Sequence, residues 1–163
     1  AVGNSGGITI KAGDINIKGV GDNNIPSGIA TSTGGKGDAG DINIEARNIT
    51  IDQSWVDSST VGDSAGKGGN ININTSNLTL KNGIISTETR GKGDAGNIKL
   101  GITDNLKLTN NSTISSEASS DSTGKAGSIN IDPKFYYNSC IVGGCLAVFI
   151  SEYNVSTLIE LDD

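Results

Sequence analysis

The chain has 163 residues, including 24 glycines, with only 4% aromatic residues and a formal net charge of −6. So few large side chains exclude a thick, aromatic-filled core, whereas the regular placing of isoleucine argues against disorder. The acidic balance, with lysines scattered along the chain, argues against nucleic acid and anionic membrane partners, because both require a cationic surface.

The first expected strand, at residues 7–10, begins a Gly-x-Ile-x-Ile pattern that recurs at 40–44, 69–73, 96–100 and 127–131. The first copy lacks the residue between glycine and isoleucine. Successive copies are 34, 29, 27 and 31 residues apart, counted between Ile8, Ile42, Ile71, Ile98 and Ile129. A fixed core pattern at a variable period is typical of a solenoid with loop insertions.

A second apolar pair follows each of the first four copies. The offset is seven residues in the first three copies and eight in the fourth, which predicts one inserted residue near Gly101. The pairs are Ile15 and Ile17, Ile49 and Ile51, Leu78 and Leu80, and Leu106 and Leu108. A third element follows at Ile29, Val56, Ile85 and Ile114. Three short alternating strands per period predict an all-β, parallel β-helix of about five coils over residues 1–132.

Alternation along these strands predicts which side chains stack on which face. One outward row consists of Thr9, Asn43, Asn72, Lys99 and Asn130, and a corner ladder of Asn48, Asn77 and Asn105. Asparagine suits a corner because it tolerates left-handed backbone and bonds along the axis. The hydroxyls expected to face inward or to the edge belong to Thr31, Thr33, Ser58, Thr60, Thr87, Thr89 and Ser116. The glycine-rich returns, such as 34–40 and 90–96, fit tight corners.

The composition changes at Pro133. Residues 133–163 hold five of the six aromatic side chains and both cysteines, so we expect a C-terminal cap or a segment exchanged with another molecule. Cys140 and Cys145, five positions apart, are expected to form a disulfide in a secreted protein, with a reduced buried pair as the alternative. The longest apolar run, 140–150, is too short to span a membrane as a helix, so we expect no membrane insertion.

The amino-terminal end has no comparable segment, so the first coil is expected to present an open edge. Either further coils precede it or a neighbouring subunit covers it. The chain contains no methionine, from which we expect it to be processed or excised from a longer product. The predicted assembly interface joins the first coil to the tail. Its residues are Ile8, Ile10, Ile15 and Ile17 at the edge, with Leu146, Val148, Ile150, Leu158 and Ile159 in the tail.

The repeats resemble those of filamentous-haemagglutinin-like exoproteins, which are large bacterial surface proteins exported by two-partner secretion. The likeness is carried by Gly-Lys-Gly-Asp-Ala-Gly-Asp-Ile-Asn-Ile at 35–44, by Asn-Ile-Thr-Ile at 48–51, and by the related segments 77–87 and 91–100. It covers about residues 3–132. The resemblance implies a right-handed β-helix, an extracellular location, and an adhesive or matrix role without a cofactor. The cysteine-bearing end departs from the family pattern.

No catalytic, cofactor-binding or metal-binding residue is predicted. The chain has no histidine, the commonest general base and metal ligand. Asp38 and Asp94, near Lys36 and Lys92, occupy equivalent loop positions, and a repeated pair argues against the unique constellation that catalysis needs. A calcium site at Asp14, Asp38 and Asp41 is the one metal alternative, because glycine-rich solenoid loops elsewhere bind this ion.

Two functions from different classes remain. In the first, the chain is a secreted or cell-surface, self-assembling subunit of a filament, sheath or matrix, joined head to tail into a homopolymer. In the second, it is the terminal part of a secreted adhesin that binds a glycan or a cell-surface receptor through its outward polar rows. Neither is an enzyme.

Overall fold

The computed structural model describes residues 3–19, 27–62, 66–120, 122–133, 147–152 and 155–158, with side chains up to Asp132. These residues form strands and contain no helix. The long strands are β1 (Ile8–Lys18), β3 (Ile42–Asp52), β5 (Ile71–Lys81), β7 (Ile98–Thr109) and the shorter β9 (Ile129–Pro133). The short strands are β2 (Gly28–Thr33), β4 (Trp55–Thr60), β6 (Ile84–Thr89), β8 (Thr113–Ala118), β10 (Ala147–Glu152) and β11 (Val155–Leu158).

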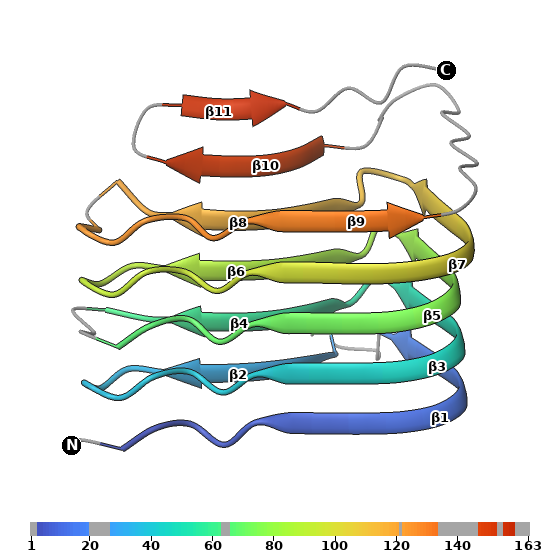
Figure 1. The fold of residues 1–163 in the computed structure, drawn as a ribbon, viewed down its shortest axis with the longest axis horizontal. Helices are drawn as coiled ribbons and strands as arrows, with labels where there is room; N and C mark the ends of the chain where they lie inside the picture. Colours follow the sequence, from blue (N-terminus) through green and yellow to red (C-terminus); the bar gives the residue numbers. More distant parts are fainter. Residues whose placement is uncertain are drawn as a thin grey trace.

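The strands form two sheets that wind into a β-solenoid, as predicted (Figure 1). One sheet has the order β1-β3-β5-β7-β9 and is parallel throughout. The other has the order β11-β10-β8-β6-β4-β2. It is parallel from β2 to β10, and β11 pairs with β10 antiparallel. Each repeat therefore supplies one strand to each wall.

Each long strand merges the first and second strands that the sequence predicted. In β3, Ile42, Ile44 and Ala46 are buried, and burial resumes at Ile49 rather than at position 48. The change of phase marks a bend at Arg47. Figure 1 shows the long strands turning at the right-hand side of the view. Backbone pairing resumes directly after the bend, so the ladder turns the corner without a loop. The expected three strands per coil are thus two.

We call the strands of one repeat a rung. The predicted register is confirmed from each rung to the next. Ile8, Ile42, Ile71, Ile98 and Ile129 pair in sequence, as do the outward residues Thr9, Asn43, Asn72, Lys99 and Asn130. The extra residue of the fourth repeat, predicted near Gly101, lies between Ile102 and Asn105. Ile102 pairs with Thr75 and Asn105 with Asn77, so three steps of β7 oppose two of β5.

The core is a thin column of branched aliphatic side chains. Ile42, Ile71 and Leu80 are among the fully buried residues, and each contributes about 1.5–3 kcal/mol to folding. Buried hydroxyls line one side of this column. Ser58 Oγ donates to the Gly40 carbonyl at 3.0 Å and accepts from Gly69 N at 3.1 Å. The predicted inward hydroxyls are therefore confirmed, and most of them bond to the backbone of the returning loops.

The repeated glycines allow neighbouring loops to stack in direct contact. A Cβ on Gly69 would overlap the carbonyl oxygen of Gly40, and a Cβ on Gly96 would overlap that of Gly69. Gly127 meets Gly96 in the same way. A second column, Gly37, Gly66, Gly93 and Gly124, repeats this geometry. Any side chain at these positions would push two rungs apart.

Candidate functional site

The first rung is the leading candidate site, and we define it as β1 with Ile8, Ile10, Ile15 and Ile17. β1 pairs with β3 on one side and is the terminal strand of its sheet in the described structure. Its four isoleucines are only partly buried, whereas Ile42 and Ile51 one rung away are 0% exposed. The apolar column therefore reaches the surface at this end.

Among the described residues, no strand pairs with the outer edge of β1. Ile8 N donates to the Asp41 carbonyl at 2.9 Å, so the amide of Ile8 points toward β3. In a parallel ladder successive residues point to alternate sides, which places the amides of Thr9 and Lys11 on the free edge. Such an edge accepts an added strand.

Two charged side chains of the first rung, Lys11 and Asp14, bond to residues of β3. The Lys11 ammonium lies 2.8 Å from Glu45, and this hydrogen bond and charge raise the pKa of Lys11. The Asp14 carboxylate accepts from Asn48 at 2.6 Å and from Arg47 at 3.3 Å, and these bonds lower the pKa of Asp14. The four charged side chains of these contacts are well exposed, and Asn48 is half-buried. These contacts fasten β1 to β3.

The corner ladder predicted from the asparagines is confirmed. Asn77 Nδ2 donates to Asn48 Oδ1 at 2.9 Å, and Asn105 Nδ2 donates to Asn77 Oδ1 at 2.7 Å. Asp14 continues the row as an acceptor at the first rung. These side chains bond along the solenoid axis and hold one repeat to the next.

The loop carboxylates have the same structural role. Asp38 Oδ1 accepts from Lys67 N at 2.8 Å, and Asp94 Oδ1 accepts from Lys125 N at 2.9 Å. Asp41 Oδ1 accepts from Asn70 N at 2.7 Å. Each carboxylate thus binds a backbone amide of the next rung.

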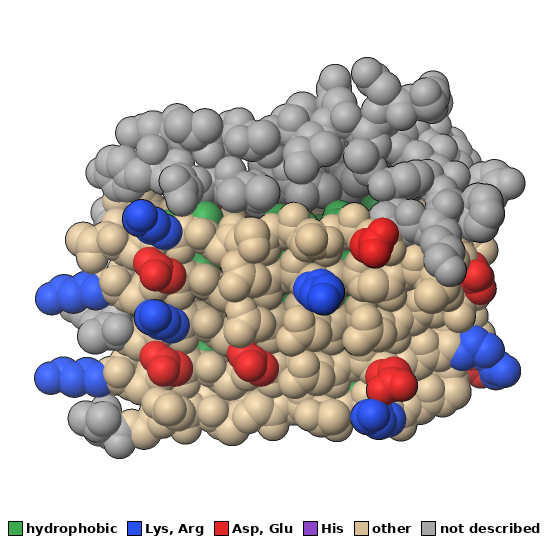
Figure 2. Space-filling model, in the orientation of Figure 1, with side chains coloured by type: hydrophobic (Ala, Val, Ile, Leu, Met, Phe, Trp, Pro, Cys, Tyr) green, Lys and Arg blue, Asp and Glu red, His purple; other side chains and the backbone are tan. Residues whose placement is uncertain are grey.

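The loop row alternates in charge. Asp38, Lys67, Asp94 and Lys125 follow one another along the solenoid axis, and Figure 2 shows acidic and basic side chains alternating along this edge. Alternation keeps like charges from stacking one rung apart.

The three aspartates of the alternative calcium site do not lie together. Asp14 lies at the bend of the long strands, whereas Asp38 and Asp41 lie in the returning loop, and each bonds to neighbouring protein groups. Within the described ranges, no group of three or more acidic or cysteine side chains could hold a metal ion. No helix of these residues is long and apolar enough to cross a membrane.

The tail half of the predicted interface is described only in part. Val148 and Ile150 lie in β10, which pairs in parallel with β8, and Leu158 lies in β11. The tail therefore extends the short-strand sheet of its own chain. Leu146, Ile159, Cys140 and Cys145 lie outside the described residues, so the disulfide stays a prediction.

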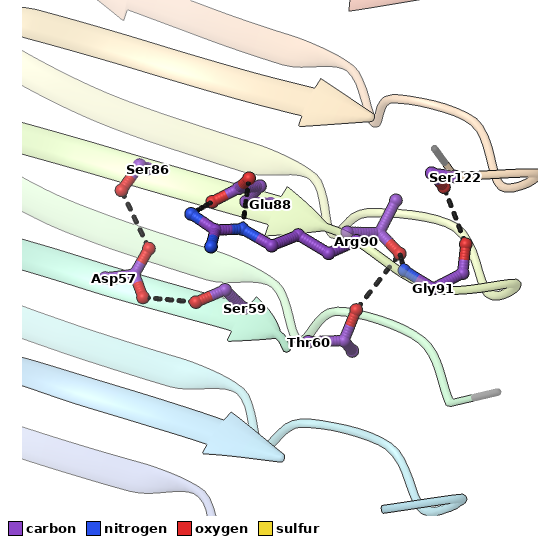
Figure 3. A network of polar contacts seen from close by, with 9 residues as sticks. Asp57, Ser59, Thr60, Ser86, Glu88, Arg90, Gly91 and Ser122 are labelled. Atoms are coloured by element: carbon purple, nitrogen blue, oxygen red, sulfur yellow. Dashed lines mark hydrogen bonds and ion pairs between the residues drawn. The ribbon is translucent and has the colours of Figure 1, made fainter. Parts of the chain in front are cut away.

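The outward row of the short strands that contains Trp55 and Ile84 was not predicted from the sequence. These residues pair across β4 and β6, and Ile84 is 43% exposed. The signal was present in the sequence, because Trp55 precedes the inward Val56 and must therefore point outward. Asp57, Ser59, Ser86 and Glu88 share this face. Asp57 accepts hydrogen bonds from Ser59 and Ser86, whereas Glu88 accepts from Arg90 (Figure 3).

Comparison with protein-family models, curated proteins and solved structures gives no match for this chain. The architecture defines the class of protein, a parallel β-solenoid, and no particular family within it. The likeness of the repeats to filamentous-haemagglutinin-like exoproteins has no support from these comparisons.

Proposed function

We propose that this chain is an extracellular, non-enzymatic structural protein, whose copies join end to end into a filament, sheath or matrix. The observation that carries the proposal is the first rung, where partly exposed Ile8, Ile10, Ile15 and Ile17 accompany a strand edge with which no described strand pairs. An edge that combines unpaired amides with apolar side chains favours strand addition.

The fold suits the docking of a strand from another copy of this chain. The same register repeats from β1 to β9, so a strand that docks on β1 in this register places isoleucine on isoleucine. The docked strand would meet Thr9 on the outer face and Asp14 at the corner, where polar ladders already run along the axis. A contact between two different ends of the molecule does not close on itself and yields a filament.

We further propose the finer architecture that this function needs. The five copies of the isoleucine pattern form a right-handed solenoid of about five coils, and residues 133–163 form its terminal segment. In the filament, the apolar residues of that segment meet the first rung of the next copy. The strand form of β10 and β11 supports this arrangement, because it supplies backbone groups for pairing.

A proline on the free edge tests the proposal. Thr9→Pro removes an amide that faces away from β3, and proline is tolerated at edge positions of this kind. Thr9→Val keeps the amide and serves as the matched control. By sedimentation velocity over a range of concentrations, we expect the control to form higher species and Thr9→Pro to remain small. Equal association of both variants would refute strand addition at β1.

A second function, adhesion through a side wall, is favoured by a different observation. The face formed by the short strands carries an outward aromatic ring next to an ordered carboxylate, a pairing that suits a sugar ligand. This function does not need the first rung, so the two proposals fail or succeed separately.

A further inference from the structure

The outer face of the short strands carries the one tryptophan of the chain. Trp55 lies beside Gly28 on β2 and Ile84 on β6. We propose that this face binds a neutral oligosaccharide, with Trp55 as the stacking surface and Asp57 as the main hydrogen-bond acceptor. The proposal goes beyond end-to-end assembly, because it concerns a side wall and not the first rung.

The ring of Trp55 lies flat on the sheet. A Cβ on Gly28 would meet the ring atoms Cδ1, Nε1 and Cε2 at 2.6, 2.6 and 2.7 Å. Three nearly equal distances mean that the face of the ring, rather than its edge, covers Gly28. The opposite face therefore points away from the sheet, and Trp55 as a whole remains partly exposed. Glycine at position 28 is what allows this arrangement.

Apolar surface continues beside the ring. Ile84 pairs with Trp55 on the next strand and is 43% exposed, although its neighbour Ile85 is completely buried. The ring and Ile84 together form an apolar strip across two strands. One face of a hexose carries C–H groups, which pack on such a strip, while its hydroxyls point to the rim.

An ordered carboxylate lies two residues along the same strand face. Asp57 Oδ1 accepts from Ser86 Oγ at 2.8 Å, and Oδ2 accepts from Ser59 Oγ (Figure 3). These bonds fix the carboxylate and leave further lone pairs on both oxygens. A sugar hydroxyl above the sheet could donate to them without a conformational change, which lowers the entropic cost of binding.

The charges around the site favour a neutral ligand. Glu88 and Glu117 are further along the face, and Arg90 binds Glu88 through two nitrogens at 2.8 and 3.2 Å. This pairing raises the pKa of Arg90, to which the charge of Asp57 adds, and the guanidinium hydrogen-bonds to Glu88 while Asp57 binds the hydroxyls of Ser86 and Ser59. An anionic polysaccharide would meet a negative carboxylate where it needs a positive group.

The single tryptophan gives the binding assay its specificity. Its fluorescence, excited where tyrosine does not absorb, is titrated with neutral oligosaccharides built from glucose, N-acetylglucosamine or mannose, and with an oligouronate as the anionic comparison. We expect saturable quenching or a spectral shift with at least one neutral series and none with the uronate. No neutral series binding, or tighter binding of the uronate, would overturn the proposal.

Variants then locate the site by isothermal titration calorimetry with the neutral series that binds. Trp55→Leu should weaken binding about tenfold or more, and Trp55→Phe should weaken it less, because it retains an aromatic face. Asp57→Ala should weaken it by a similar factor to Trp55→Leu. Thr79→Ala, an outward change on the other wall, is the control and should bind normally. The proposed location would be refuted if Trp55→Leu, Trp55→Phe and Asp57→Ala all fold and bind the sugar with normal affinity. An unaffected sugar affinity in Thr9→Pro would separate this result from the assembly test.

Discussion

The glycine columns give the most demanding test of the stacking geometry. In Gly96→Ala the new Cβ overlaps the Gly69 carbonyl, which is backbone and cannot turn aside. The rungs must part, which disturbs the bonds that join them here: Gly68 N to Asp94 O at 2.8 Å, Ile71 N to Asn97 O at 2.9 Å, Asn97 N to Asn70 Oδ1 at 3.0 Å, and Thr87 Oγ1 to Gly96 O at 2.7 Å. At about 1 kcal/mol for each bond, the expected loss is about 4 kcal/mol. A domain whose total stability is about 5–15 kcal/mol would lose much of it.

Urea unfolding followed by circular dichroism measures this loss. Gly13→Ala is the matched control, because a Cβ at Gly13 has no atom within 4 Å and its backbone is not in the left-handed region. The control should change stability by less than about 1 kcal/mol in either direction. If Gly96→Ala unfolded at the same urea concentration as Gly13→Ala, direct stacking of glycine on the carbonyl below would be wrong.

Three further changes test single contacts. Thr87→Val removes one of two buried donors to the Gly96 carbonyl, and the other, Ser116 Oγ at 3.0 Å, remains. We therefore expect the free energy of unfolding to fall by about 1 kcal/mol. An unchanged free energy of unfolding would show that the Thr87 hydroxyl does not contribute to stability. Asn77→Ala removes the corner-ladder bonds to both neighbouring repeats and should lower the free energy of unfolding by about 1–2 kcal/mol. No change would show that the ladder does not stabilise the fold. Because the folded pKa of Asp14 is lowered, its contribution is present above the unfolded carboxyl pKa of about 3.9 and is lost as the pH falls through the folded value. Asp14→Asn should therefore lessen the fall in stability at acid pH, most clearly at low salt; identical pH profiles would show that Asp14 is not coupled to folding.

The sequence predicted the parallel stacking well because a solenoid repeats its contacts. Once Ile42 and Ile71 are recognised as equivalent, the pairing of Asn43 with Asn72 and of Asn48 with Asn77 follows from counting. The inward hydroxyls followed from the same alternation. The acceptors of these hydroxyls could not be predicted, because nothing in the sequence near Ser58 indicates that it bonds to the Gly40 carbonyl of a returning loop.

Other features depended on backbone geometry that a residue pattern does not report. The bend at Arg47 preserves pairing on both sides, so two expected strands are one. The turns between the walls place Gln53, Asn82 and Asn110 in the left-handed region, and the sequence analysis had not singled out any of the three. Trp55 was overlooked because a lone aromatic breaks the repeat, and repetition was the signal that carried the prediction.

End-to-end assembly is the central proposal, and electron microscopy of negatively stained native protein tests it most directly. The proposal predicts regular unbranched fibres that lengthen with protein concentration, with a matching increase of particle size in solution. These fibres should be present in Thr9→Val and absent from Thr9→Pro. Separate short particles at every concentration, in both variants and in the native protein, would contradict it.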